Sequence, residues 1–126
     1  MKTPPRWKIG ACLLAALTLV SPASARVVGR VHAMFQSTVK IEVTGGPIIY
    51  IDPTNIATTP ADADFVLLTH NHGDHQSVAD LNRVRKASTV FVSSPPGAPA
   101  LMTNFPTSTV QVVTPGAKLT LGGVED

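Results

Sequence analysis

One short cluster of polar residues limits the folds open to this 126-residue chain more than any other feature. It holds three of the four histidines together with one aspartate: His70, His72, Asp74 and His75. A continuous apolar run, residues 65–69, precedes the cluster and has the length and composition of a strand buried on both faces. Ser77 and Asp80 follow it with the spacing of a helix capping box. The cluster is therefore expected on a turn between a buried strand and a helix N-terminus.

The residue types and spacing of this cluster predict a metal site. Neutral imidazole and carboxylate are good ligands for zinc and similar divalent ions. On an extended segment, positions i and i+2 point the same way, so His70 and His72 can hold one ion together. Gly73 is expected to allow a sharp turn that brings Asp74 and His75 to a second, neighbouring ion. The alternative is a polar loop with solvated histidines, which the concentration of ligands in six residues disfavours.

The remainder of the chain predicts short strands alternating with short helices. Val78, Leu81 and Val84 form an apolar stripe at helical spacing, with basic residues Arg83, Arg85 and Lys86 towards the helix end. The first two of the remaining strands, joined by a turn at 45–47, predict a hairpin. The expected strands are 38–43, 48–51, 89–92, 109–113 and the start of one more at 118–121, with a short helical turn inside 95–106. This alternation after a hairpin indicates an α/β layered domain.

Residues 1–25 are expected to be a cleaved signal peptide. Three basic residues lie in the first eight positions, a mostly apolar run spans 9–20, and Ala23–Ala25 is a small-residue cleavage site. A membrane anchor is the alternative, but a span needs about 20 apolar residues and Ser21 and Pro22 interrupt this run. A lipidated cysteine fits less well, because Cys12 lies near the start of the run. The protein is thus expected to be exported, either periplasmic or secreted.

Removal of the predicted signal peptide changes the net charge and the cysteine content of the chain. Three of the ten basic residues leave with it, so seven face eight acidic residues. A nearly neutral chain lacks the basic face of a nucleic-acid binder, and we expect a small-molecule substrate and no stable membrane anchor. The single cysteine also leaves, which excludes a disulfide or a cysteine-based metal site in residues 26–126.

The segment Leu68–His75 resembles the H-x-H-x-D-H signature of the metallo-β-lactamase-fold superfamily. Residues 49–53, 90–92 and 114–116 follow the order seen in its lactonase-like bacterial branch, and the resemblance extends from about His32 to residue 126. It implies an αββα sandwich and a hydrolase in which a metal-activated water attacks an ester, lactone, amide or phosphoester bond. It also implies two divalent ions, zinc in the first place, with manganese or iron as alternatives.

The resemblance also implies roles for individual residues. His70 and His72 correspond to ligands of the first ion, and Asp74 and His75 to ligands of the second. Asp74 is in addition the candidate catalytic residue, because it would help to position the attacking water. Asp52, which ends a predicted strand, is expected to support the ligands by hydrogen bonding, although an ordinary turn acid is an equal alternative.

Two further expectations concern the outer parts of the site. His32 is expected before the first strand, either near the ligands or in a purely structural role. The superfamily's remaining ligands, a third histidine, a bridging aspartate and a last histidine, have no counterpart here, since no histidine follows His75. Residues 26–126 are therefore expected to be the N-terminal half of the domain. The alternative is a truncated, catalytically inactive metal-binding or assembly module.

Overall fold

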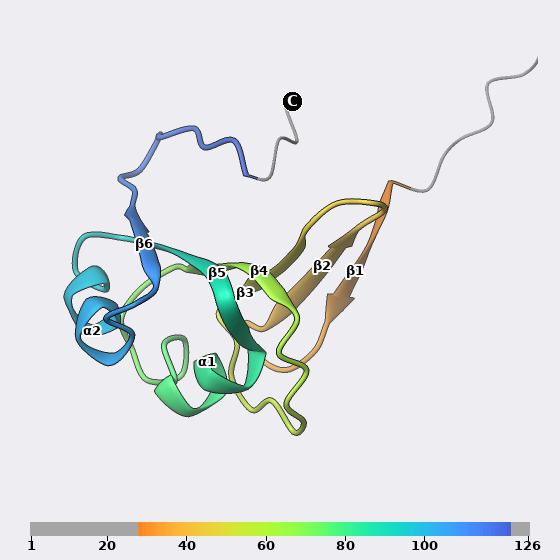
Figure 1. The fold of residues 1–126 in the computed structure, drawn as a ribbon, viewed down its shortest axis with the longest axis horizontal. Helices are drawn as coiled ribbons and strands as arrows, with labels where there is room; N and C mark the ends of the chain where they lie inside the picture. Colours follow the sequence, from red (N-terminus) through yellow and green to blue (C-terminus); the bar gives the residue numbers. More distant parts are fainter. Residues whose placement is uncertain (1–27, 122–126) are drawn as a thin grey trace, which may run out of the picture.

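The computed structural model describes residues 28–121, which form one six-stranded sheet with two short helices (Figure 1). The predicted signal peptide lies outside the described residues. No helix in the described part of the chain is long and apolar enough to cross a membrane. The elements are β1 (Gly29–Ala33), β2 (Val39–Val43), β3 (Ile48–Ile51), β4 (Ala63–Leu68), α1 (Val78–Val84), β5 (Arg85–Ser93), α2 (Ala98–Asn104) and β6 (Thr109–Val112).

The strands lie in the sheet in their order along the chain, β1 to β6. The first three pair antiparallel, and β3 to β6 pair parallel. The predicted hairpin is present as β2 and β3, with Ile41 opposite Ile49. Helices α1 and α2 connect β4 to β5 and β5 to β6, as parallel neighbours require. The α/β class predicted from the sequence is confirmed, and the carboxyl ends of β3, β4 and β5 meet at one edge of the sheet.

Three local expectations were wrong. Strand β1 was not predicted, and it contains His32, which the sequence placed before the first strand. Strand β5 begins at Arg85, directly after α1, so Arg85 and Lys86 lie on a strand and not at the helix end. Residues 118–121 form an isolated bridge at Leu121 in place of a strand. In each case pairing with a neighbouring strand, which one segment's sequence does not contain, decides the backbone conformation.

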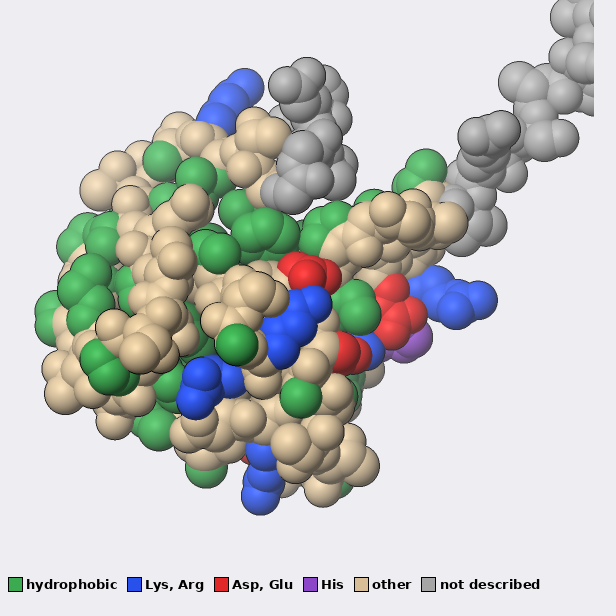
Figure 2. Space-filling model, in the orientation of Figure 1, with side chains coloured by type: hydrophobic (Ala, Val, Ile, Leu, Met, Phe, Trp, Pro, Cys, Tyr) green, Lys and Arg blue, Asp and Glu red, His purple; other side chains and the backbone are tan. Residues whose placement is uncertain are grey.

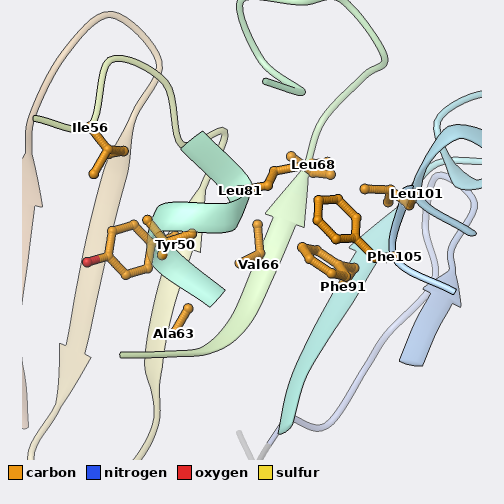
Figure 3. Packing of buried hydrophobic residues seen from close by; sticks show 10 residues of the cluster. Tyr50, Ile56, Ala63, Val66, Leu68, Leu81, Phe91, Leu101 and Phe105 are labelled. Carbon is orange, nitrogen blue, oxygen red and sulfur yellow. The ribbon is translucent and has the colours of Figure 1, made fainter. Parts of the chain in front are cut away.

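The helices cover one face of the sheet and enclose the core of the described region. Figure 3 shows Leu81 of α1 beside Val66 and Leu68 of β4, and Phe91 of β5 beside Phe105. The two phenyl rings stack with their centroids 4.9 Å apart. The buried apolar residues that pack into one core cluster are Tyr50, Ile56, Ala63, Val66, Leu68, Leu81, Val84, Phe91, Leu101 and Phe105. The core therefore holds the end of β4 and the start of α1, and with them the turn between.

The start of α1 is set by Ser77, the N-cap half of the predicted capping box, while the Asp80 carboxylate binds the amides of Asn55 and Ile56 instead of that of Ser77. The Ser77 hydroxyl accepts a hydrogen bond from the Asp80 amide at 3.3 Å, and Ser77 itself is extended, as an N-cap residue should be. Leu81 and Val84 are fully buried, whereas Val78, the third member of the predicted stripe, is 40% exposed. A helix of only seven residues is not stable alone, so packing of these two side chains holds it in place.

Leu81→Ala is expected to lower the free energy of unfolding by about 2–5 kcal/mol, because it leaves a cavity in a fully buried site. Val78→Ala on the same helix is the matched control and should cost less than about 1 kcal/mol, since this side chain is largely exposed. Urea titration followed by far-ultraviolet circular dichroism measures both values. Equal losses in the free energy of unfolding for the two variants would contradict the burial of Leu81 in the core.

Candidate metal centre

The histidine cluster forms a compact turn between β4 and α1, at the edge where the parallel strands end. The carbonyl of His72 accepts hydrogen bonds from the amides of His75 at 3.0 Å and Gln76 at 2.7 Å. These bonds turn the chain back towards the sheet. Gly73 lacks the left-handed backbone conformation, and a Cβ added to it would meet nothing within 4 Å. The expected sharp turn is present, and it is closed by the hydrogen bonds to the carbonyl of His72 without a left-handed backbone at Gly73.

The turn brings together three of the four predicted ligands. Ligand atoms of His70, Asp74 and His75 all lie within 4.8 Å of one another. The rings of His70 and His75 have centroids 3.9 Å apart, and His75 Nε2 lies 3.6 Å from a carboxylate oxygen of Asp74. The fourth, His72, lies outside this group, with its ring edge-on to His70 at a centroid distance of 4.6 Å.

This donor set fits a divalent ion. Two ligands bound to one zinc at about 2.1 Å lie at most about 4 Å apart, so the three side chains need only small movements to share an ion. The Asp74 side chain is 63% exposed, which leaves the open side of the group accessible to solvent. The grouping differs from the pairs expected from the sequence, because His70 lies with Asp74 and His75 and not with His72 alone.

Asp52 lies directly beneath the group and contacts it through hydrogen bonds. It follows β3, is 2% exposed, and accepts from the Thr69 amide at 2.8 Å, the Thr69 hydroxyl at 2.6 Å and His75 Nδ1 at 2.9 Å. Its φ of 43° lies in the left-handed region, which costs of the order of 1 kcal/mol for a residue with a side chain. A strained, buried carboxylate that accepts three hydrogen bonds from the turn is more than an ordinary turn acid.

The structure adds a residue that the sequence analysis missed. Thr38 is 1% exposed, and its hydroxyl lies 2.9 Å from the carbonyl oxygen of Asp52 and accepts from the Thr54 amide at 2.9 Å. These contacts hold the unusual backbone at Asp52 from the far side. A threonine at the start of a predicted strand carries no signal for this role, because its partners lie 14 and 16 positions away.

The structure places His32 away from the turn. Its ring lies 3.4 Å from a Glu42 carboxylate oxygen, and strands β2 and β3 separate β1 from β4 by roughly 14 Å. Glu42 in turn pairs with Lys40, whose ammonium group also binds Asp62 at 2.8 Å. Acidic and basic side chains lie next to one another on the face shown in Figure 2, with a histidine at their margin. His32 thus takes part in a charged network on the sheet, in keeping with the structural alternative.

This network has a buried member in Tyr50. Its hydroxyl donates to Asp62 at 3.0 Å. Burial and the neighbouring carboxylate raise the pKa of Tyr50 to about 12. Burial alone would lower the pKa of Lys40, but its hydrogen bonds to Asp62 and Glu42 outweigh that effect and raise it. Both groups therefore keep their protons across the physiological range.

Comparison with known proteins agrees with the fold and the turn. Residues 30–125 match the family described as the beta-lactamase superfamily domain. A UPF0173 metal-dependent hydrolase of Geobacillus sp. (strain WCH70) is 41% identical over 66 residues, which are 47% of this chain and 28% of that relative. The chain thus matches less than a third of the relative's length. Because the family match takes in nearly the whole sheet and the complete His70–His75 turn, this chain belongs to the beta-lactamase superfamily domain family.

Proposed function

We propose that this chain is the metal-binding part of an exported metal-dependent hydrolase. The observation that carries the proposal is the convergence of His70, Asp74 and His75 at one edge of the sheet, above the buried carboxylate of Asp52. Family membership and the printed name of the Geobacillus relative support the same activity. Export rests on the leader pattern of residues 1–25 alone.

The proposed ligands are His70, His72, Asp74 and His75, for two divalent ions with zinc preferred. His72 is exposed, so rotation of its side chain can bring it to an ion shared with His70. When bound, the metal would activate a water as nucleophile and polarise the carbonyl or phosphoryl oxygen of the substrate. An ester, lactone, amide or phosphoester is compatible with that chemistry.

The protein groups have separable tasks in this proposal. The imidazoles of His70 and His75 provide neutral nitrogen ligands, and hydrogen bonds to Thr69 and to the buried Asp52 fix the direction in which each ring points. The exposed carboxylate of Asp74 faces the side from which a substrate would approach, so it can both hold an ion and accept a hydrogen bond from the attacking water.

Turnover that depends on added metal tests the proposed activity. The whole hydrolase of which this chain is proposed to be the metal-binding part is assayed with zinc or manganese on lactone, phosphodiester and β-lactam substrates, and again after chelation. We expect activity that chelator removes and metal restores, and a loss of at least about 100-fold in His72→Ala. His32→Ala, with its histidine on β1, is the control and should keep full activity.

Two other outcomes would be decisive. Stoichiometric metal binding without turnover on any substrate class would support the alternative, a metal-binding module that is inactive by itself. Chelator-resistant turnover, or full activity in His72→Ala, would remove these residues from the mechanism.

A further inference from the structure

One buried carboxylate reaches both imidazoles of the candidate metal group, one directly and one through a hydroxyl. Asp52 Oδ2 lies 2.9 Å from His75 Nδ1 and 2.6 Å from the Thr69 hydroxyl. The same hydroxyl oxygen lies 3.0 Å from His70 Nδ1. The four side chains therefore form one connected chain, from His75 through Asp52 and Thr69 to His70.

The positions of the hydrogens in this chain follow from what each group can donate. An ionised carboxylate only accepts, so His75 Nδ1 must carry a hydrogen to make its contact with Asp52. With Nδ1 occupied by that hydrogen bond, Nε2 is the ring nitrogen left to bind a metal. That nitrogen is the one found 3.6 Å from the Asp74 carboxylate, on the side where an ion would lie.

The same reasoning passes through the hydroxyl to His70. The Thr69 hydroxyl has a single hydrogen, and the 2.6 Å contact with Asp52 requires it, because two acceptor oxygens would otherwise repel at that distance. Thr69 Oγ1 is then left as an acceptor, so His70 Nδ1 must donate to it. His70 is thereby held in the same tautomer as His75, with its Nε2 lone pair free for a metal.

We propose that Thr69 is a positioning residue, which links Asp52 to His70 by hydrogen bonds and holds His70 with Nε2 directed to the metal, as Asp52 itself holds His75. The inference rests on the proposed function for its purpose, but the tautomers themselves are properties of the metal-free chain. It also accounts for the strained backbone of Asp52: at φ 43° its carboxylate accepts from both the amide and the hydroxyl of Thr69.

Nitrogen NMR of the histidine rings tests the proposal directly. In the metal-free full chain labelled with ¹⁵N, we expect His70 and His75 each to carry a hydrogen on Nδ1, held by the contacts with Thr69 and Asp52. Thr69→Val removes the hydroxyl at similar size. His70 should then lose the preference for a hydrogen on Nδ1, while His75, which contacts Asp52 directly, should keep its hydrogen there. Thr69→Ser keeps a hydroxyl and should restore the His70 signal, and Thr107→Val is the control for an exposed threonine.

Zinc affinity, measured by competition with a chromophoric chelator, gives a second readout. Loss of a group that orients a ligand lowers metal affinity about 10–100-fold, so Thr69→Val should fall in that range and Thr69→Ser within about threefold of the parent chain. Asp52→Asn should change the position of the ring hydrogen in both His70 and His75, because it alters the carboxylate that joins the two hydrogen-bonded branches.

The outcomes separate this inference from the proposed function. If His70 keeps the same tautomer in Thr69→Val while the parent chain binds zinc, the relay is wrong and the metal-dependent activity stands. If the parent chain binds no zinc but the tautomers change as described, the hydrogen-bonded chain stands and the proposed function fails. If Thr69→Ser behaves as Thr69→Val, the threonine acts through packing and the proposal is overturned.

Discussion

Zinc binding is expected to fall by more than about 100-fold in His75→Ala, and by a similar factor in His70→Ala. Each substitution removes one of three ligand atoms that lie within 4.8 Å of one another. Removing groups that only orient a ligand already costs 10–100-fold, so loss of the ligand itself should cost at least as much. His75→Ala also leaves Asp52 Oδ2 without its imidazole partner, which loosens the turn as well as the site.

Isothermal titration of the metal-free chain with zinc measures these affinities, and elemental analysis gives the number of ions bound. The matched control is His32→Ala, which removes a histidine from the charged network on β1 and β2 and should leave zinc binding unchanged. If His32→Ala weakens binding as much as His75→Ala, the metal does not bind at the turn. If neither variant changes binding, the histidine group is not the metal site.

Asp80→Ala is expected to lower the free energy of unfolding by about 2–4 kcal/mol. Asp80 is only 8% exposed, and its carboxylate accepts hydrogen bonds from the amides of Asn55 and Ile56, both at 3.0 Å. It also pairs with Arg83 at 3.0 Å. Alanine leaves the buried Ile56 amide without a partner, which costs about 1–3 kcal/mol, and it also removes the bonds to the Asn55 amide and to Arg83. Because the loop that follows Asp52 is tied to α1 by these bonds, the loss also loosens the support of the candidate site.

The contribution of Asp80 should depend on pH. Burial would raise the pKa of this carboxyl, but hydrogen bonds from Ser77, Ile56 and Asn55, together with Arg83, outweigh it and lower the pKa below its ordinary value of 3.8. A lowered folded-state pKa means that the stabilisation is fully present above about pH 4 and is lost as the pH falls through the folded-state value. The stability of the parent chain should therefore decline steeply in this acidic range, and that of Asp80→Ala less steeply.

Urea titrations between pH 3 and pH 7 measure both effects. The exposed Asn82→Ala on the same helix is the control and should change stability by less than about 0.5 kcal/mol. Parallel pH profiles for the parent chain and Asp80→Ala would show that this carboxylate does not contribute the acid-sensitive stabilisation.

Much of the fold could be predicted from the sequence, because the patterns that indicate strands and helix ends involve neighbouring residues. Ile48–Ile51 was predicted at its observed bounds, and the apolar run before His70 is the end of β4. The Ser77 capping box marks the first turn of α1 as expected, because the capping hydrogen bond joins residues three positions apart. The element boundaries that failed, at His32 and Arg85, depend on which strand lies alongside, and that is settled only when the sheet forms.

By itself, the sequence determined that three imidazoles and one carboxylate lie on a turn between a strand and a helix, since strand, turn and cap each depend on neighbouring residues. Only the tertiary structure decided how these groups are held. The contacts of Asp52 with Thr69 and His75, and of Thr38 with Asp52, join residues 14 to 23 positions apart. The physical reason is that a side chain's hydrogen-bond partner is set by the pairing of β2, β3 and β4, which places distant residues at one edge of the sheet.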